Sequence, residues 1–213
     1  MDKINGAIQI KTRFIDYLLG NYNTELIGIE VPYLFGYRRA DLVAIINNKT
    51  VAYEIKSELD SLSKLSAQIN DYVDVFNEVY VVLAEKYKRS SIISKLPQKV
   101  GIYYIDQNNK ISLQRKAKEQ RILNPEKLIY FFKKEEMVRL GNMDSNFSLR
   151  KTREKFLKQN SIKNIVEYSK DILRNKYQEK YKTFLSERGE YTIKDDLYLL
   201  TGSEKNSQIL QLT

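Results

Sequence analysis

The sequence predicts an α/β (α+β) fold in which a mixed sheet with its helices forms the first half of the chain and helices form the second. Short apolar runs and strand-like alternation recur before residue 115, whereas helical spacing dominates beyond it. The amino-terminal elements are expected in the order α-β-β-β-α-β, which requires both a hairpin and a crossover connection. We therefore expect a core at 1–115 and a basic helical region at 116–213 that packs on the core or extends from it.

The elements of the core follow from their apolar spacing. Residues 4–19 carry apolar side chains at helical spacing and end at Gly20, which predicts the first helix. Residues 60–76 show the same spacing and predict the second helix. The strands are expected at 26–33, 39–46, 51–57, 79–84, 101–106 and 111–114, with a short helix at 89–96.

The second half has clear helix signals. Asn124, Pro125 and Glu126 combine an N-cap side chain, a proline at the first helical position and an acid in the first turn. The helices are expected at 125–140, 148–158, 161–187 and 193–200.

The composition of the 213 residues limits the chemistry. The chain has no cysteine and no histidine, which excludes disulfides, thiolate catalysis, thiolate zinc sites and histidine bases. A metal would need oxygen ligands, which suits Mg²⁺ or Mn²⁺. No apolar run reaches the roughly 18 residues of a membrane span, and the amino terminus lacks a signal-peptide core. We expect a cytoplasmic protein without a membrane partner.

The net charge of +9 lies mainly in the second half. Residues 1–112 hold 14 basic and 13 acidic side chains, a balance of +1, whereas residues 113–213 hold 22 and 14, a balance of +8. Such a field suits a phosphate backbone, so nucleic acid is the expected partner. Solvated lysines on helix surfaces are the alternative explanation. The sequence leaves a second copy of the chain or a protein partner open.

Two carboxylates and a lysine interrupt the apolar pattern of the predicted hairpin. In its first strand the odd positions share one face, and in its second strand the even positions do. A loop of even length, such as two residues drawn from 47–49, puts Asp41, Glu54 and Lys56 on the same face. Neighbouring carboxylates repel, and a divalent ion between them would relieve the repulsion. A cross-strand ion pair on a solvated sheet face is the alternative.

The order of these residues resembles that of the PD-(D/E)xK nuclease superfamily. Asp41 lies on one strand, Glu54-Ile55-Lys56 lies on the next, and a helix and a further strand follow. That helix carries Gln68-Ile69-Asn70-Asp71-Tyr72, which is similar to the Q-x-x-x-Y signature of the recombination-type exonuclease branch. The stretches RRADLVAI, YEIKSELDSLSKLSAQINDYVDVFNEVYVV, LPQKVGIYYI and NPEKLIYFFKKEEMVRLG look like those of a phage- and prophage-associated family of this superfamily. The resemblance covers about residues 5–190 and is strongest over 38–83.

The resemblance implies a restriction-endonuclease-like αβββαβ core followed by a helical region. It also implies that Asp41 and Glu54 bind Mg²⁺ or Mn²⁺ and that Lys56 positions or polarises the attacking water. The main-chain carbonyl of Ile55 would be a further ligand. Glu30 matches an acid of the phage family and would be a third acidic residue, with an ordinary strand-end glutamate as the alternative.

Three residues are candidates for substrate binding by the same resemblance. Arg39 would contact phosphate or pair with an acid. Gln68 and Tyr72 lie one helical turn apart and could both reach substrate or the carboxylates, although Tyr72 also fits the apolar stripe. Asp60 is expected to cap the second helix, with metal binding as the alternative.

Two functions are compatible with the sequence. The first is a metal-dependent nuclease that hydrolyses phosphodiester bonds, with DNA as the expected substrate and the basic half of the chain as the DNA-binding region. The alternative is a catalytically silent nuclease-fold protein of phage origin that binds or regulates a partner in host defence or repair. The complete set of Asp41, Glu54 and Lys56 favours the enzyme, because a binding module has no stability reason to cluster acids beside a lysine. Either would act in a bacterial or phage-infected cell.

Overall fold

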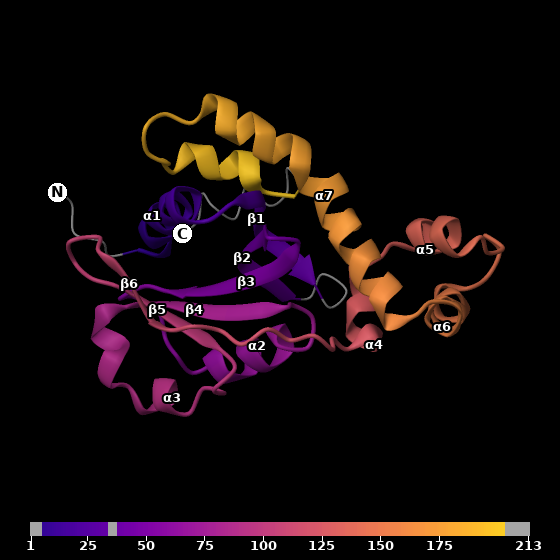
Figure 1. Ribbon diagram of the computed structural model, residues 1–213, viewed down its shortest axis with the longest axis horizontal. Coiled ribbons are helices and arrows are strands. Elements are labelled where there is room, and N and C mark those ends of the chain that lie inside the picture. The colour runs from indigo at the N-terminus through magenta and orange to yellow at the C-terminus, as the bar shows by residue number, and fades with distance from the viewer. Residues whose placement is uncertain (1–5, 34–37, 203–213) are drawn as a thin grey trace.

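A mixed six-stranded sheet runs through the computed structural model, with helices on both of its faces (Figure 1). The structure describes residues 6–33 and 38–202. The strands lie in chain order across the sheet: β1 (Thr24–Tyr33), β2 (Arg38–Ile46), β3 (Lys49–Lys56), β4 (Glu78–Ala84), β5 (Gly101–Ile105) and β6 (Ile111–Arg115). β3, β4 and β5 pair in parallel, and the other neighbours pair antiparallel. The predicted mixed sheet and α-β-β-β-α-β order are confirmed.

Helices make up most of the remaining chain. They are α1 (Ala7–Asn21), α2 (Leu65–Tyr72), α3 (Ser91–Ser94), α4 (Pro125–Leu128), α5 (Lys134–Gly141), α6 (Leu149–Gln159) and α7 (Ile162–Glu187). Three 3₁₀ segments accompany them: η2 (Glu85–Arg89), η3 (Ile129–Phe131) and η4 (Asp195–Leu200). None of the helices in the described residues combines the length and apolar character that crossing a membrane requires.

The second helix is shorter than the predicted 60–76. Asp60 closes a turn before the helix instead of capping it, because its Oδ2 accepts the main-chain N–H of Ser57 at 2.7 Å. The N-cap position of α2 is Lys64, so the predicted cap at Asp60 is wrong. The hydrogen bond within this turn delays the start of the helix.

The predicted helix at 125–140 is broken into α4, η3 and α5. Asn124 caps α4 as predicted, with its side-chain oxygen accepting the N–H of Glu126 at 3.0 Å. Phe132 is extended, with φ −93° and ψ 133°, and its ring lies 5.4 Å from that of Phe156 in α6. Burial of this ring against a distant part of the chain outweighs helix continuity.

The β2–β3 hairpin has a loop of even length, which is the condition for Asp41, Glu54 and Lys56 to share one face. Ile46 pairs with Lys49, which leaves Asn47 and Asn48 as a loop of two residues. Their φ values of 50° and 60° belong to the left-handed region required by a type I′ turn, and asparagine tolerates this region better than most residues. The loop fixes the register of the two strands.

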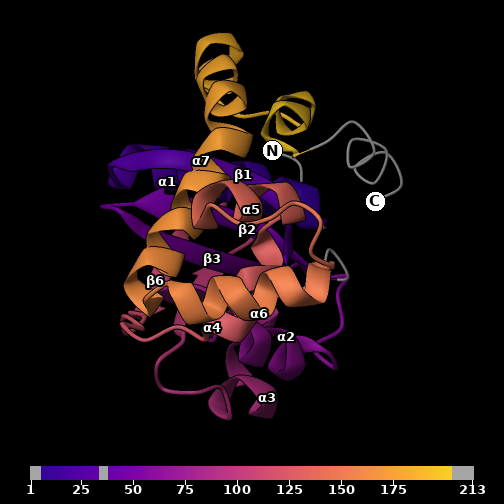
Figure 2. The same ribbon diagram turned by 90° about the vertical axis from the view of Figure 1, so that its right-hand side faces the viewer.

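Two hydrophobic clusters, one on each face of the sheet, hold the elements together. Phe14 of α1 lies in one cluster and Ile69 of α2 lies in the other. Helix α7 contributes to both, with Tyr177 on the α2 side and Phe184 on the α1 side. Figure 2 shows α7 beside the sheet, with α5 and α6 on the side that faces the viewer. The basic region therefore packs on the core, while the division at residue 115 stays a prediction.

The contact between α7 and the edge strand β1 depends on a glycine. A Cβ atom added at Gly28 would lie 2.9 Å from Cδ1 of the Tyr177 ring, which is fully buried. The glycine therefore lets the ring lie directly on the backbone of the edge strand.

Gly28→Ala should lower the free energy of unfolding by about 1–3 kcal/mol, because the added methyl group overpacks the contact with Tyr177. Urea denaturation would measure the change. Gly189→Ala is the matched control, since no atom lies within 4 Å of a Cβ at that position. Equal unfolding midpoints for the two variants would contradict this account of α7.

Candidate active site

Three acidic residues form one row across β1, β2 and β3, at the end of the hairpin away from its loop. The neighbouring regular pairs are Ile29 with Leu42, Val31 with Ala40, and Leu42 with Tyr53. These registers place Glu30 opposite Asp41, and Asp41 opposite Glu54. The β2–β3 ladder ends at the pair before the row, so Asp41 and Glu54 lie where the strands begin to separate.

The backbone is irregular at this row. Glu30 has a φ of 49°, in the left-handed region that few residues other than glycine adopt. Ile29 belongs to the cluster on the α1 side, whereas Val31 belongs to the cluster on the α2 side. The alternation of side chains between the two faces of the sheet therefore shifts by one residue at Glu30. Asp41 Oδ2 accepts the N–H of Ile55 at 2.7 Å, and this side-chain bond takes the place of a ladder bond. Backbone irregularities of this kind cluster at functional sites.

Hydrogen bonds from two side chains fix the carboxylate of Glu54. Its side chain is fully buried, and its two oxygens have different donors. Oε1 accepts a hydrogen bond from Nζ of Lys56 at 2.7 Å, and Oε2 accepts one from the hydroxyl of Tyr72 at 2.6 Å. A buried carboxylate needs such partners, and here both are charged or polar side chains aimed at defined oxygens.

Helix α2 supplies the support behind Glu54 and Lys56. Gln68 Oε1 lies 3.2 Å from Nζ of Lys56, so Gln68 and Tyr72 both reach the ion pair from one face of the helix. Tyr72 is fully buried, and its ring centroid lies 5.3 Å from that of Tyr33. The sequence suggested either core packing or contact with the carboxylates for Tyr72. Both apply, because the ring packs in the core and the hydroxyl donates a hydrogen bond to Glu54. Substrate binding by Gln68 or Tyr72 stays a prediction.

Lys11 of α1 is a member of the site that the sequence reasoning missed. Its side chain is 6% exposed, and its Nζ lies 2.7 Å from Oε1 of Glu30. A signal was present, because Ile8, Lys11, Ile15 and Leu18 follow helical spacing and place a lysine within the apolar stripe of α1. A lysine buried in this way requires an acidic partner, which Glu30 provides.

Repulsion between carboxylates dominates the electrostatics of the row. Burial, followed by the charge of Glu54, raises the pKa of Asp41 to about 7, with Glu30 adding to the rise and Lys11 opposing it. Burial alone would lower the pKa of Lys56, but Glu54 and Asp41 outweigh burial, and the pKa is raised. Lys56 is therefore protonated at neutral pH, so it can supply positive charge but cannot accept a proton.

Arg39 lies beside the row and differs from its neighbour Arg38. Arg38 pairs with Asp71, with 3.6 Å between Nε and Oδ2. Within the described residues Arg39 forms no ion pair with a carboxylate. Which of the two roles that the sequence leaves open for Arg39 applies, contact with phosphate or pairing with an acid, stays a prediction.

The residues fit a magnesium site built on two carboxylates. In residues 6–33 and 38–202, no three Asp or Glu side chains gather closely enough to hold a metal ion together. Glu30 is engaged by Lys11, and Glu54 is engaged by Lys56 and Tyr72, so the ligand roles of the acids and of the Ile55 carbonyl all stay predictions. Asp41 and Glu54 are the predicted pair, and Mg²⁺ is commonly held by one or two carboxylates while it keeps several waters. The raised pKa of Asp41 means that added positive charge there would be favourable.

Comparisons with known proteins point to bacteriophages. Residues 7–201 match the family described as "Bacteriophage P4 protein cII". Protein cII of Enterobacteria phage P4 is 30% identical over 182 residues, covering 81% of this chain and 68% of that protein. A protein of unknown function from Silicibacter pomeroyi aligns in structure over 88% of this chain and 98% of its own, with 11% identity and a TM-score of 0.41. The expected phage association is confirmed, whereas membership of the PD-(D/E)xK superfamily stays a prediction.

Asp41→Asn should stabilise the protein, and the gain should grow as the pH rises from about 4 to about 7. An acid whose pKa is raised by folding binds its proton more tightly in the folded state, so its ionisation costs stability above the unfolded value of 3.8. One pKa unit corresponds to about 1.4 kcal/mol, and a shift of this size at a half-buried group predicts about 2 kcal/mol near neutral pH.

Urea denaturation of both proteins at acidic and neutral pH would measure this gain. Asp171→Asn is a suitable control, because Asp171 is exposed and pairs with Arg174 on the same helix. A difference between wild type and Asp41→Asn that does not change with pH would contradict the predicted repulsion.

Proposed function

The chain belongs to the bacteriophage P4 protein cII family, and we propose that it hydrolyses phosphodiester bonds in nucleic acid, with DNA as the expected substrate. One observation carries the proposal. Asp41, Glu54 and Lys56 meet where the β2–β3 ladder opens, with Lys56 Nζ 2.7 Å from Glu54. Two carboxylates and a protonated lysine form a suitable set for metal-assisted attack of water on a phosphodiester.

Each residue of the site has a separate role in this proposal. Asp41 and Glu54 would hold Mg²⁺ or Mn²⁺, which when bound lowers the pKa of water and neutralises charge on the scissile phosphate. Lys56 stays protonated and stabilises the negative charge that develops on the phosphate oxygens. Tyr72 and Gln68 hold Glu54 and Lys56 in position through the bonds at 2.6 and 3.2 Å.

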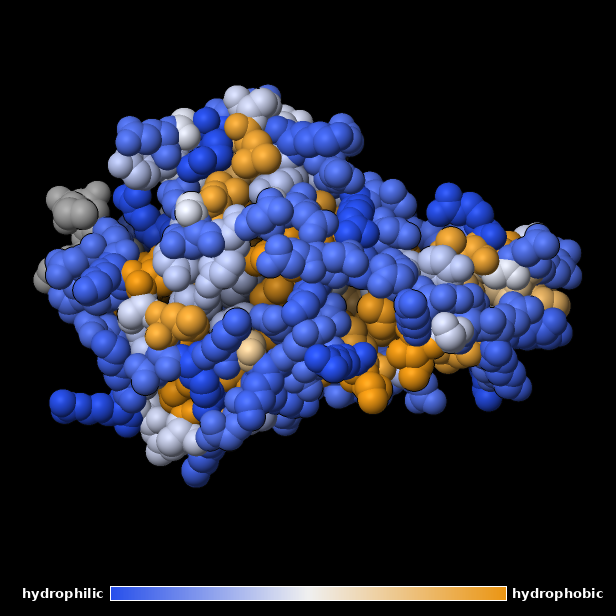
Figure 3. All heavy atoms as spheres, in the orientation of Figure 1, coloured by the Kyte–Doolittle hydropathy of each residue, from blue (hydrophilic) through white to orange (hydrophobic). Residues whose placement is uncertain are grey.

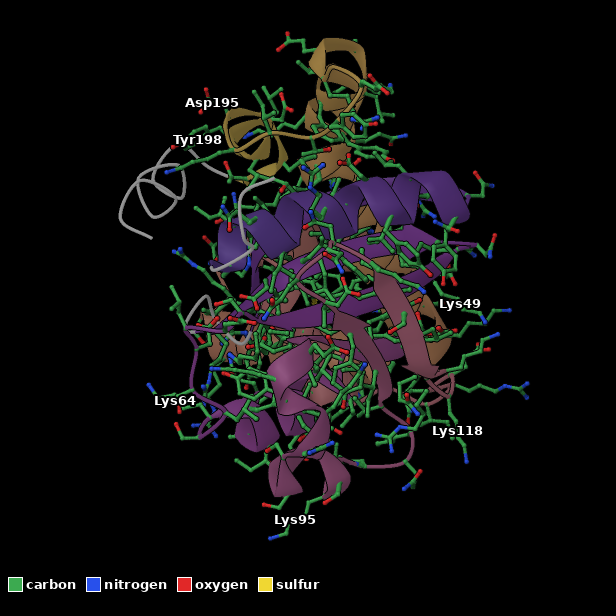
Figure 4. The ribbon with its side chains drawn as sticks, turned by 90° about the vertical axis from the view of Figure 1, so that its left-hand side faces the viewer. Lys49, Lys64, Lys95, Lys118, Asp195 and Tyr198 are labelled. Atoms are coloured by element: carbon green, nitrogen blue, oxygen red, sulfur yellow. The ribbon has the colours of Figure 1, made fainter. Side chains whose placement is uncertain are left out.

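The charge of the second half supports a nucleic-acid substrate. Its balance is +8, against +1 for residues 1–112. Three lysines of the core serve as a comparison: Lys49, Lys64 and Lys95 point outward into solvent (Figure 4). Lys49 pairs with Glu119 at 2.8 Å, so its charge is locally compensated. The uncompensated charge lies in the second half, where long-range attraction of phosphate would be strongest.

Wild-type protein should cleave plasmid or oligonucleotide substrates when Mg²⁺ or Mn²⁺ is added, and each of Lys56→Ala, Glu54→Gln and Asp41→Asn should reduce the rate by about 100-fold or more. Lys64→Ala is the control, because Lys64 is an exposed lysine outside the site. Undiminished cleavage by the three site variants would remove the row from the reaction. No cleavage by the wild type of any DNA or RNA would favour the second function.

A catalytically silent nuclease-fold protein that binds or regulates a partner in host defence or repair is the second candidate. Lys11 favours it, because this buried lysine already places a positive charge among the acids. Glu30, Asp41 and Glu54 all act to raise the pKa of Lys11 against the opposing effect of burial. A lysine that compensates the acids in this way could stabilise the fold without any metal.

Magnesium should raise the melting temperature of the wild type but not that of Asp41→Asn, if the row binds the ion. At one hundred times the dissociation constant the expected stabilisation is about 2.7 kcal/mol. Differential scanning calorimetry with Mg²⁺ or Ca²⁺, and with EDTA as the blank, would measure it. If the silent function is correct, the wild type should show no shift, whereas Lys11→Met, which removes the competing charge, should acquire one.

A further inference from the structure

A groove lies between the edge strand β1 and the helices of the second half. It has a volume of about 330 Å³, and its walls come from β1, η3, α6 and α7. The lining residues that matter here are Pro32, Tyr130, Phe131, Lys133, Arg153 and Lys176. In Figure 3 hydrophobic side chains show on the surface around α4 and the adjoining end of α7, and further hydrophobic patches show over the core. The groove combines aromatic walls with cations.

Positive charge is concentrated at this groove. Lys133 and Lys176 are exposed, and Arg153 is half-buried. Desolvation, followed by the charges of Lys133 and Lys180, lowers the pKa of Lys176, and Arg39 contributes to the same effect. Cations that crowd one another in this way would be relieved by an anion.

Glu136 opposes the effect of these cations on the pKa of Lys176, and its carboxylate is already engaged. Its Oε2 accepts the main-chain N–H of Lys133 at 2.6 Å, where it caps α5. Among the described residues, Lys133, Arg153 and Lys176 line the groove and no carboxylate side chain does, so its charge suits phosphate.

The groove adjoins the acidic row through β1 and Tyr177. Pro32 lies two residues after Glu30 in the same strand. Tyr177 lines the groove and packs on Gly28, and the charges of both Arg39 and Glu30 act on its hydroxyl. A strand of nucleic acid in the groove would thus continue past Arg39 toward Asp41 and Glu54.

We propose that this groove, named here the η3–α7 groove, binds a single-stranded segment of nucleic acid, with a base against Tyr130 and Phe131 and its phosphates on Lys133, Lys176 and Arg39. Both aromatic side chains are half-buried, and the guanidinium carbon of Arg153 lies 5.0 Å from the centroid of Tyr130. Stacking on aromatic rings and on guanidinium planes requires a base that has left the duplex. A pocket of 330 Å³ lies at the lower end of the range of about 300–1,000 Å³ for small ligands, so it admits one nucleotide and not a duplex.

The experiment is fluorescence anisotropy with a labelled oligothymidine and a duplex of equal length, both in EDTA so that no cleavage occurs. Lys133→Ala/Lys176→Ala should weaken binding of the single strand and reduce its log–log salt slope by about 1.4, since each phosphate contributes about 0.7 on single strands. The matched control is Lys158→Ala/Lys163→Ala, which removes the same charge from exposed positions on α6 and α7. Tyr130→Leu should weaken binding by about fivefold or more without changing the salt slope.

Tighter binding of the single strand than of the duplex, with a loss confined to the groove variants, would support the proposal. Preference for the duplex, or equal losses in the groove and control variants, would overturn it.

The substrate path rests on the proposed hydrolysis, but the binding test does not. If wild type binds the oligonucleotide in this manner and never cleaves it, the hydrolysis fails and the groove stands. If it cleaves through Asp41 while the groove variants bind normally, the groove fails and the hydrolysis stands.

Discussion

The bond from the Ile55 N–H to the Asp41 carboxylate, 2.7 Å long, is the contact on which the candidate site depends. It lets a side chain replace the main-chain partner at the place where β2 and β3 part, so the strands can separate without leaving this buried donor unsatisfied. Separation places the carboxylates of Asp41 and Glu54 just beyond the last pair of the β2–β3 ladder. Their mutual repulsion follows, and so does the attraction of the row for lysines or a metal ion.

Helix α7 connects this site to the second half of the chain. Its Tyr177 ring lies against Gly28 in β1, two residues before Glu30, and the helix contributes buried side chains to the clusters on both faces of the sheet. The basic region is thereby fixed next to the acidic row. A positively charged groove beside a negatively charged site can hold the phosphate backbone while the carboxylates remain available for a metal ion.

Local sequence signals predicted the helices, the strands and the shared face of Asp41 and Glu54. The features that these signals missed depend on contacts between distant parts of the chain. Asn47 and Asn48 fix a two-residue loop, so the shared face of Asp41 and Glu54 follows from register alone. Lys11 could not be assigned in the same way, because its partner Glu30 lies on a different element. The break at Phe132 likewise depends on Phe156, which follows it by 24 positions in the sequence and packs on it only in the fold.

Diffraction from crystals grown with Mn²⁺, recorded at a wavelength where manganese scatters anomalously, tests the central claim most directly. The account predicts a manganese peak between the carboxylates of Asp41 and Glu54, at a ligand distance near the roughly 2.0–2.1 Å typical of the similar Mg²⁺ ion. Lys56 should remain hydrogen-bonded beside it. A crystal that shows no manganese at this position, with Lys11 and Lys56 alone neutralising the acidic row, would contradict the account.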